Sequence, residues 1–166
     1  MYPEWNVHKK KSSVPSMKGF ESRDVVGLVV FDGEKFLLMH RKLHWSGWEF
    51  PKGHMIVGET VDEAIKRELF EETGLCKYEL VGKIDAFNYF DNVRSTKTFI
   101  QNFLLHVSSN NKITFEHQSV YKGEKVAEHD GFKWCFPKEA VQLLKHRNMK
   151  DTMRKAIVKL GLEIGK

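Results

Sequence analysis

The sequence lacks long apolar runs, repeats and cysteine-rich segments. No stretch approaches the about 20 apolar residues that cross a bilayer, so we expect no association with a membrane. No apolar segment follows the lysines near the N-terminus, so we expect no secretory signal. The two cysteines, Cys76 and Cys135, are too few for a disulfide framework or a cysteine-only zinc site. We expect both to be reduced thiols in a cytoplasmic protein.

What is present is typical of one globular domain. The 166 residues are 41% hydrophobic and 30% charged, which allows a sizeable buried core. The formal net charge of +5 favours a polyanionic partner only weakly, because many proteins without such a partner are basic. We expect a polar N-terminal arm over residues 1–22 and one folded domain over 23–166. The Lys9–Lys11 run in the arm is either an RNA contact or an ordinary solvated segment.

Hydrophobic patterning predicts strands on both sides of a central helix. Apolar runs over 25–31 and 35–41 flank the turn signal Asp32-Gly33, which predicts a hairpin. Further strands are expected at 78–90, 96–107, 112–115 and 132–136, and a helix is expected to begin near Pro137. An apolar stripe on a final helix comprises Met149, Met153, Ala156, Ile157 and Leu160. This order of elements predicts a mixed sheet with helices on its faces.

The clearest predicted helix covers residues 61–73. Thr60 and Glu63 have the spacing of a capping box at its start. Gly74 stands where a left-handed residue commonly ends a helix. The boundaries of this helix therefore follow from local chemistry alone.

Three carboxylates crowd one side of this helix. Glu68, Glu71 and Glu72 are spaced i, i+3 and i+4, with Glu68 and Glu72 inside the arc of the apolar stripe and Glu71 just outside it. Like charges at this spacing repel by about 0.2–0.5 kcal/mol per exposed pair, and the helix dipole also disfavours them near the C-terminus. One interpretation is an acidic face partly neutralised by Arg67. The other is a site for a hard divalent cation, Mg²⁺ or Mn²⁺, which prefers oxygen ligands.

The residues around the helix decide between these interpretations. Gly53, Glu59 and the segment Arg67-Glu68-Leu69-Phe70-Glu71-Glu72-Thr73-Gly74-Leu75 fit the pattern G-x5-E-x7-R-E-U-x-E-E-x-G-U, where U is aliphatic, without a departure. In this segment the sequence resembles the Nudix family of hydrolases. The resemblance implies an α/β fold, the Nudix-type α/β/α sandwich, which has a central mixed sheet and flanking helices.

The resemblance also implies roles for these residues. Glu71 and Glu72 would be magnesium ligands, and Glu68 a further ligand or the base that activates water. Gly53 would turn its carbonyl oxygen toward a metal. Arg67 would orient the glutamates, and Glu59 would brace the loop against the helix. The implied cofactor is Mg²⁺, with Mn²⁺ as an alternative.

Outside the box the sequence is similar to asymmetrical diadenosine tetraphosphate hydrolases, a branch of the same family. The similarity lies in the segments Trp48–His54, Asn88-Tyr89, Thr96–Thr98 and Glu128–Trp134, of which the last is also similar to bacterial RNA pyrophosphohydrolases.

By that likeness Glu128 would be a metal ligand or general base, although a plain surface acid is the alternative. Lys52 and Lys97 would contact phosphates, or be ordinary solvated lysines. Tyr89 would stack on a base, or pack at the rim of the core. His54 would contact phosphate or support the site.

Three substrates are compatible with this chemistry. The leading hypothesis is hydrolysis of a dinucleoside polyphosphate with release of a mononucleotide and a nucleoside triphosphate. The alternatives are removal of phosphates from the 5′ end of RNA and house-cleaning of modified nucleoside triphosphates. An inactive nucleotide-binding or RNA-binding module is disfavoured because every glutamate of the box is present. Nothing in the sequence indicates a protein partner.

Overall fold

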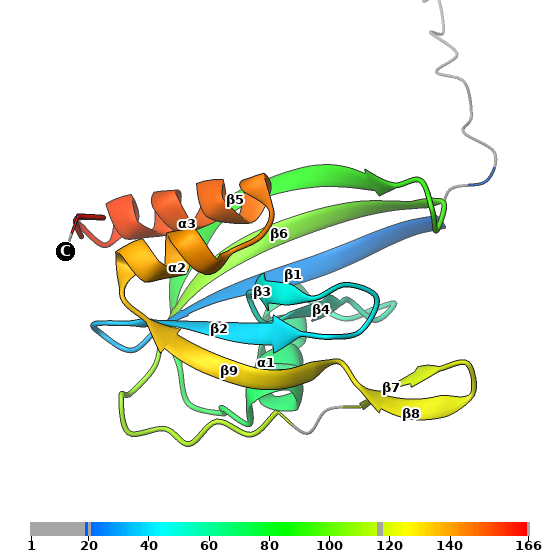
Figure 1. The fold of residues 1–166 in the computed structure, drawn as a ribbon, viewed down its shortest axis with the longest axis horizontal. Helices are drawn as coiled ribbons and strands as arrows, with labels where there is room; N and C mark the ends of the chain where they lie inside the picture. The colour runs from blue at the N-terminus through cyan, green and yellow to red at the C-terminus, as the bar shows by residue number, and fades with distance from the viewer. Residues whose placement is uncertain (1–18, 20, 116–117, 166) are drawn as a thin grey trace, which may run out of the picture.

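A computed structural model describes residues 19, 21–115 and 118–165 of the chain. Its main sheet has seven strands in the order β3-β2-β1-β6-β5, with β4 paired to β1 and β9 paired to β2 (Figure 1). The strands are β1 Glu21–Phe31, β2 Phe36–Arg41, β3 Gly47–Glu49, β4 Lys52–His54, β5 Glu79–Asp91, β6 Thr96–His106 and β9 His129–Cys135. A separate hairpin consists of β7 Gln118–Tyr121 and β8 Glu124–Ala127, and the helices are α1 Val61–Thr73, α2 Pro137–Leu143 and α3 Arg147–Lys159.

The main sheet is mixed and is covered on both faces. β1 runs parallel to β6, whereas its pairings with β2 and β4 are antiparallel. Alternate residues of β1 enter different cores: Val26, Leu28 and Val30 pack in the cluster that contains the apolar side of α1. Val29 and Phe31 pack with residues of α2 and α3. The predicted α/β/α arrangement is therefore confirmed, and Figure 1 shows α2 and α3 on the opposite side of the sheet from α1.

Helix α1 begins and ends where the sequence predicts. The Thr60 side chain accepts a hydrogen bond from the Glu63 backbone N–H, and the Glu63 carboxylate accepts one from the Thr60 backbone N–H. Gly74 adopts a left-handed conformation with φ of 73° and donates its N–H to the carbonyl oxygen of Phe70. The helix thus places its glutamates at fixed positions against the edge of the sheet.

Most of the other predicted elements are confirmed. Phe31 pairs with Phe36 across the expected hairpin. A helix begins at Pro137, and the tail stripe is buried through Met153, Ala156 and Ile157. Among the described helices, none is long and apolar enough to cross a membrane.

The expected arm over residues 1–22 and the expected domain over 23–166 stay predictions. β1 begins at Glu21, before the expected domain start at residue 23, because Glu21 pairs with Thr96 at the end of the parallel β1–β6 ladder. Most of the expected arm, residues 1–18 and 20, lies outside the described residues, and so does the Lys9–Lys11 run.

The predicted strand over 112–115 is wrong. These residues form no strand, although Ile113 is buried and Phe115 packs on the α1 side of the core. The backbone N–H of Thr114 donates to the carbonyl oxygen of Thr73 at 2.9 Å. The alternating pattern therefore reflects a loop packed against the C-terminal end of α1. The β7–β8 hairpin was not predicted, since its strands are only four residues each and offer little apolar periodicity.

Candidate active site

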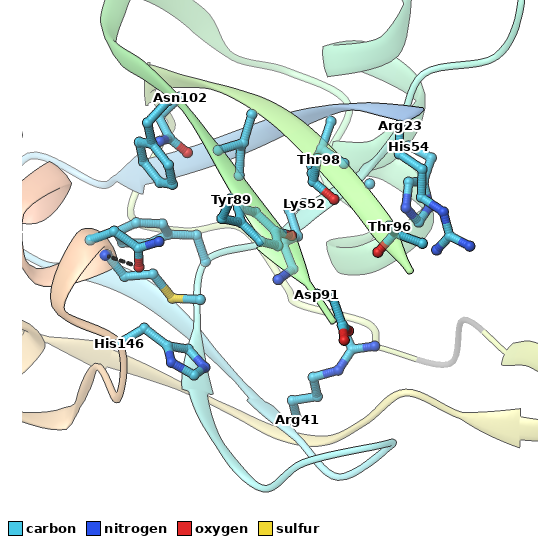
Figure 2. A pocket seen from close by; sticks show the side chains of 18 of the residues that line it. Arg23, Arg41, Lys52, His54, Tyr89, Asp91, Thr96, Thr98, Asn102 and His146 are labelled. Carbon is cyan, nitrogen blue, oxygen red and sulfur yellow. Dashed lines mark hydrogen bonds between the residues drawn. The ribbon is translucent and has the colours of Figure 1, made fainter. Parts of the chain in front are cut away.

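A cleft of about 1200 Å³ opens between the sheet, the β2–β3 loop and the start of α3. Its floor is one face of β1, β6 and β5, where residues in register form rows across the three strands (Figure 2). Arg23, Thr98 and Tyr89 form one such row, and Gly27 and Asn102 belong to another. The box residues Gly53, Arg67, Glu68, Glu71 and Glu72 line the same cleft, as does Glu128. The fold thus joins a carboxylate cluster to an extended polar and aromatic floor.

Gly53 leaves the space that the Glu68 carboxylate occupies. A Cβ atom built on Gly53 would lie 1.8 Å from Cδ of Glu68 and 1.9 and 2.1 Å from its two oxygens. A side chain at position 53 would therefore require the Glu68 carboxylate to move from this position. Glu68 is 6% exposed, so this close approach fixes a buried carboxylate beside the Gly53 backbone.

Arg67 holds three acidic side chains at once. Its Nε and Nη2 atoms donate to the two oxygens of Glu59 at 2.7 and 2.9 Å. Its Nη1 atom donates to Glu68 at 2.5 Å and to Glu71 at 3.2 Å, and Nη2 also donates to the carbonyl oxygen of His54 at 2.8 Å. The hydrogen bond with Glu59 is the main cause that raises the pKa of Arg67. Arg67 thereby ties the loop after β4 to the glutamates of α1.

Glu72 approaches Glu128 and His129 from the other side of the cleft. Ligand atoms of these three residues all lie within 4.8 Å of one another. The backbone of Glu128 is fixed by a hydrogen bond: its carbonyl oxygen accepts from the backbone N–H of Lys42 at 2.9 Å. Burial, followed by the negative charges of Glu49, Glu128 and other carboxylates, raises the pKa of Glu72 well above its usual value. A bound cation would offset the repulsion between these closely spaced carboxylates.

A second layer of buried charge supports this cluster. Glu49 is fully buried and receives Arg41 Nη1 at 3.0 Å, Lys52 Nζ at 2.9 Å and His129 Nε2 at 3.0 Å. Burial opposes the charged form of Glu49, but the charges of Lys52 and Arg41 and the hydrogen bond with His129 outweigh it and hold the pKa of Glu49 well below its usual range. Arg41 also lies 3.4 Å from Glu128. Glu49 and Arg41 thus connect Lys52 and His129 to Glu128 through ion pairs and hydrogen bonds.

The predicted substrate-binding residues do not all reach the cleft. Lys52, His54 and Tyr89 line it, and Figure 2 shows the Tyr89 ring next to the Lys52 side chain. Lys97 does not line it, because its neighbours Thr96 and Thr98 face the cleft and alternation along β6 turns Lys97 away. Its Nζ atom instead lies 5.9 Å from the centroid of the Phe90 ring.

Sequence reasoning missed several lining residues. Their common feature is a position on alternate residues of β1 and β6 or at the start of α3: they are Arg23, Val25, Gly27, Thr96, Thr98, Ile100, Asn102, His146 and Met149. The period-two spacing within each strand was a usable signal. What the sequence did not reveal is that β1 and β6 are neighbours.

The residues present fit a hard divalent cation. Glu68, Glu71, Glu72 and Glu128 offer only carboxylate oxygens, which Mg²⁺ and Mn²⁺ prefer, and Gly53 keeps the approach to Glu68 open. Among the described residues, His129 is the one nitrogen donor grouped with these carboxylates: its Nε2 atom is bonded to Glu49, and its Nδ1 atom lies 3.9 Å from Glu72. Because carboxylate oxygens outnumber this single nitrogen, the donor set favours Mg²⁺ or Mn²⁺ over zinc.

Several sequence relatives from bacteria carry the name RNA pyrophosphohydrolase. The protein from Haemophilus ducreyi is 28% identical over 149 residues, which is 80% of this chain and 73% of the relative. The protein from Caulobacter vibrioides is 38% identical over 74 residues, and this match spans 43% of each protein. The second match therefore covers less than half of that relative's length.

Solved structures of low sequence identity share the fold. A Caenorhabditis elegans Ap4A hydrolase has a TM-score of 0.70 at 22% identity, covering 84% of this chain and 98% of that one. An Escherichia coli dihydroneopterin triphosphate pyrophosphohydrolase has a TM-score of 0.64 at 19% identity, covering 82% and 95%. Proteins named for different substrates thus share this architecture.

The NUDIX domain model matches residues 21–157, which include every strand of the main sheet and most of α3. That range also contains Gly53, the glutamates of α1 and Glu128. The chain therefore belongs to the Nudix family.

Proposed function

We propose that this enzyme hydrolyses a dinucleoside polyphosphate such as diadenosine tetraphosphate. The observation that carries the proposal is a single cleft in which the carboxylate cluster adjoins Lys52 and Tyr89. At about 1200 Å³ the cleft exceeds the roughly 300–1000 Å³ of most small-ligand sites, which suits a substrate with two nucleosides. Tyr89 would stack on one base, and Lys52 would face the phosphates.

The proposed metal ligands are the carbonyl oxygen of Gly53 and the carboxylates of Glu68, Glu71, Glu72 and Glu128. A bound Mg²⁺, or Mn²⁺ in its place, would neutralise phosphate oxygens and make a coordinated water more acidic. Arg67, through its bonds to Glu68 and Glu71, would keep these carboxylates oriented.

In the proposed reaction a water oxygen forms a bond to a phosphorus remote from one nucleoside, and the anhydride P–O bond to the leaving phosphate breaks. The water proton passes to Glu68 or Glu128, the two candidates for the base. The products are a mononucleotide and a nucleoside triphosphate. We expect this chemistry in the cytoplasm, consistent with the unpaired Cys76 and Cys135.

A second candidate substrate is the 5′-polyphosphate end of RNA. The observation that favours it is the 28% identity with the Haemophilus ducreyi RNA pyrophosphohydrolase over 80% of this chain. The same carboxylates and the same cleft would serve this reaction. Only the group on the far side of the scissile bond differs.

Product analysis with Mg²⁺ tests the proposal. Diadenosine tetraphosphate, a 5′-triphosphorylated RNA oligonucleotide and the nucleoside triphosphates are each incubated with the enzyme, and the products are separated by anion exchange. We expect AMP and ATP from diadenosine tetraphosphate. Turnover of RNA without turnover of diadenosine tetraphosphate would replace the leading substrate with the second one.

A further inference from the structure

A second, basic groove lies between β5 and α3, outside the cleft. Its lining consists of Lys83 and Ile84 from β5 and Arg154, Lys155, Val158 and Lys159 from α3, and its volume is about 420 Å³. We call it the β5–α3 groove. Figure 1 shows α3 beside β5 along this part of the strand. Four of the six lining residues are cationic, and no acidic residue of the described chain lines the groove.

Two of the four cations have no carboxylate partner. Among the residues that the structure describes, neither Lys83 nor Lys159 forms an ion pair; Lys83 donates to the neutral side chain of Gln101 at 2.8 Å. A Cβ atom built on Gly82 would lie 3.6 Å from Lys159 Nζ, so this ammonium group lies over β5. Arg154 pairs with Asp151, and Lys155 pairs with Asp85. Two of the four positive charges of the groove are therefore not offset by a carboxylate of the described residues.

An irregularity in β5 brings the groove together. Lys83 pairs with Phe103 and Asp85 with Asn102, which leaves Ile84 as an extra residue in the strand. Such a bulge disturbs the alternation of side chains, and both Lys83 and Ile84 line the groove. α3 itself carries five cationic residues and one acidic residue.

The groove and the cleft lie between the same two elements. Both are walled by β5 and α3: the cleft by Phe87, Tyr89 and Thr152, and the groove by the residues that follow on α3 and precede on β5. Asp85 lies at the junction, where it binds Thr152 at 2.9 Å and Lys155 at 3.0 Å. From Thr152 to Lys159 the helix rises about 10 Å, enough for roughly three phosphates of a stacked strand.

We propose that the β5–α3 groove binds the phosphodiester backbone of a single-stranded RNA whose 5′ end occupies the cleft. This inference rests on the proposed function of the cleft as the site for a nucleotide 5′ end, and it extends the substrate class to ends that carry an RNA chain. Lys83, Arg154 and Lys159 would contact successive phosphates without reading the bases.

An anionic membrane is a poorer fit to the same charges. A helix that binds in the interface inserts an apolar face, but the apolar face of α3 is buried in the core through Met153, Ala156 and Ile157. Val158 is the only large hydrophobic residue of α3 that is strongly exposed among the described residues. The groove thus presents positive charge that can bind the phosphates of an RNA strand, but little exposed apolar surface that could insert into a bilayer.

The test measures binding without hydrolysis. The probe is a single-stranded RNA of about 12 nucleotides with a 5′-hydroxyl group, labelled at its 3′ end, and fluorescence anisotropy is measured on the full chain in EDTA. The triple variant Lys83→Gln/Arg154→Gln/Lys159→Gln removes three groove charges. The matched control Lys66→Gln/Lys77→Gln/Lys138→Gln removes three exposed charges elsewhere. Thermal unfolding shows whether the groove variant and the control variant are folded. If the triple groove variant is not folded, the single variants Lys83→Gln and Lys159→Gln are measured in its place.

We expect the groove variant to raise the Kd for RNA about tenfold or more and the control to change it by less than about twofold. The slope of log K against log salt should fall by about 2, at about 0.7 per lost phosphate contact. Equal weakening by both variants would overturn the inference. So would a groove variant that loses binding to phosphatidylglycerol vesicles but keeps binding to RNA.

The outcomes for the groove and for the cleft are separable. If the wild type hydrolyses diadenosine tetraphosphate while the groove variant binds RNA as well as the control does, the groove inference fails and the proposed function stands. If RNA binding depends on the groove but no polyphosphate is hydrolysed, the proposed function fails and the groove remains an RNA site.

Discussion

Replacing Gly53 with alanine introduces one methyl group at the point where β4 meets α1. The new Cβ atom would lie 1.8 Å from Cδ of Glu68, whereas such contacts essentially never fall below 3.0 Å. The Glu68 carboxylate must therefore recede by more than 1 Å, away from its 2.5 Å bond with Arg67. Because a misplacement of about 1 Å costs on the order of a hundredfold in rate, we expect kcat/KM to fall about a hundredfold.

Steady-state hydrolysis of diadenosine tetraphosphate with Mg²⁺ and unfolding in urea measure the two consequences of Gly53→Ala. Overpacking should lower the free energy of unfolding by about 1–3 kcal/mol. The double variant Gly53→Ala/Glu68→Ala removes the obstruction, so its stability should match that of Glu68→Ala while its activity stays low. This pattern separates the steric effect from the loss of a site carboxylate.

Gly131→Ala is the matched control, because a Cβ atom at Gly131 meets no atom within 4 Å. It should leave both stability and turnover near wild type. Wild-type kcat/KM and stability in Gly53→Ala, or an equal impairment in Gly131→Ala, would contradict this prediction.

Two further predictions concern stability. Glu49→Gln leaves the half-buried cations Arg41 and Lys52 without their buried carboxylate and should lower the free energy of unfolding by about 3–5 kcal/mol at neutral pH, as measured in urea. The folded-state pKa of Glu49 is depressed, so its contribution to the free energy of unfolding is present above the unfolded pKa of 4.5 and is lost as the pH falls below that value. The difference in stability between wild type and Glu49→Gln should therefore narrow in acid. A difference that does not depend on pH would contradict this. Thr60→Ala removes the capping hydrogen bond to Glu63 and should cost about 1 kcal/mol, whereas Thr60→Ser should retain most of it; equal losses would exclude the cap as the cause.

The helix of the box could be predicted almost completely from the sequence because its determinants are local. The cap at Thr60, the end at Gly74 and the shared side of Glu68 and Glu72 all follow from spacings of three or four residues. The burial of Glu68 and Glu72 also follows from their place in the apolar arc.

The layer around Glu49 could not be predicted in the same way. Arg41, Glu49 and His129 meet because β9 pairs with β2 across about 90 positions of sequence, and no local pattern specifies that pairing. Lys97 shows the opposite case: alternation along β6 was readable, and it turns Thr96 and Thr98 rather than Lys97 toward the cleft. Similarity of motif thus suggested a lysine that strand geometry places elsewhere.

In the proposed mechanism the α1 glutamates hold the divalent ion on which hydrolysis depends. Turnover of diadenosine tetraphosphate by Glu72→Gln at saturating Mg²⁺ tests it most directly, with Glu124→Gln on the exposed β8 as control. We predict that Glu72→Gln loses at least about a hundredfold in kcat/KM, since metal stabilisation of the transition state contributes several kcal/mol, and that Glu124→Gln does not. Near wild-type turnover by Glu72→Gln would contradict the account.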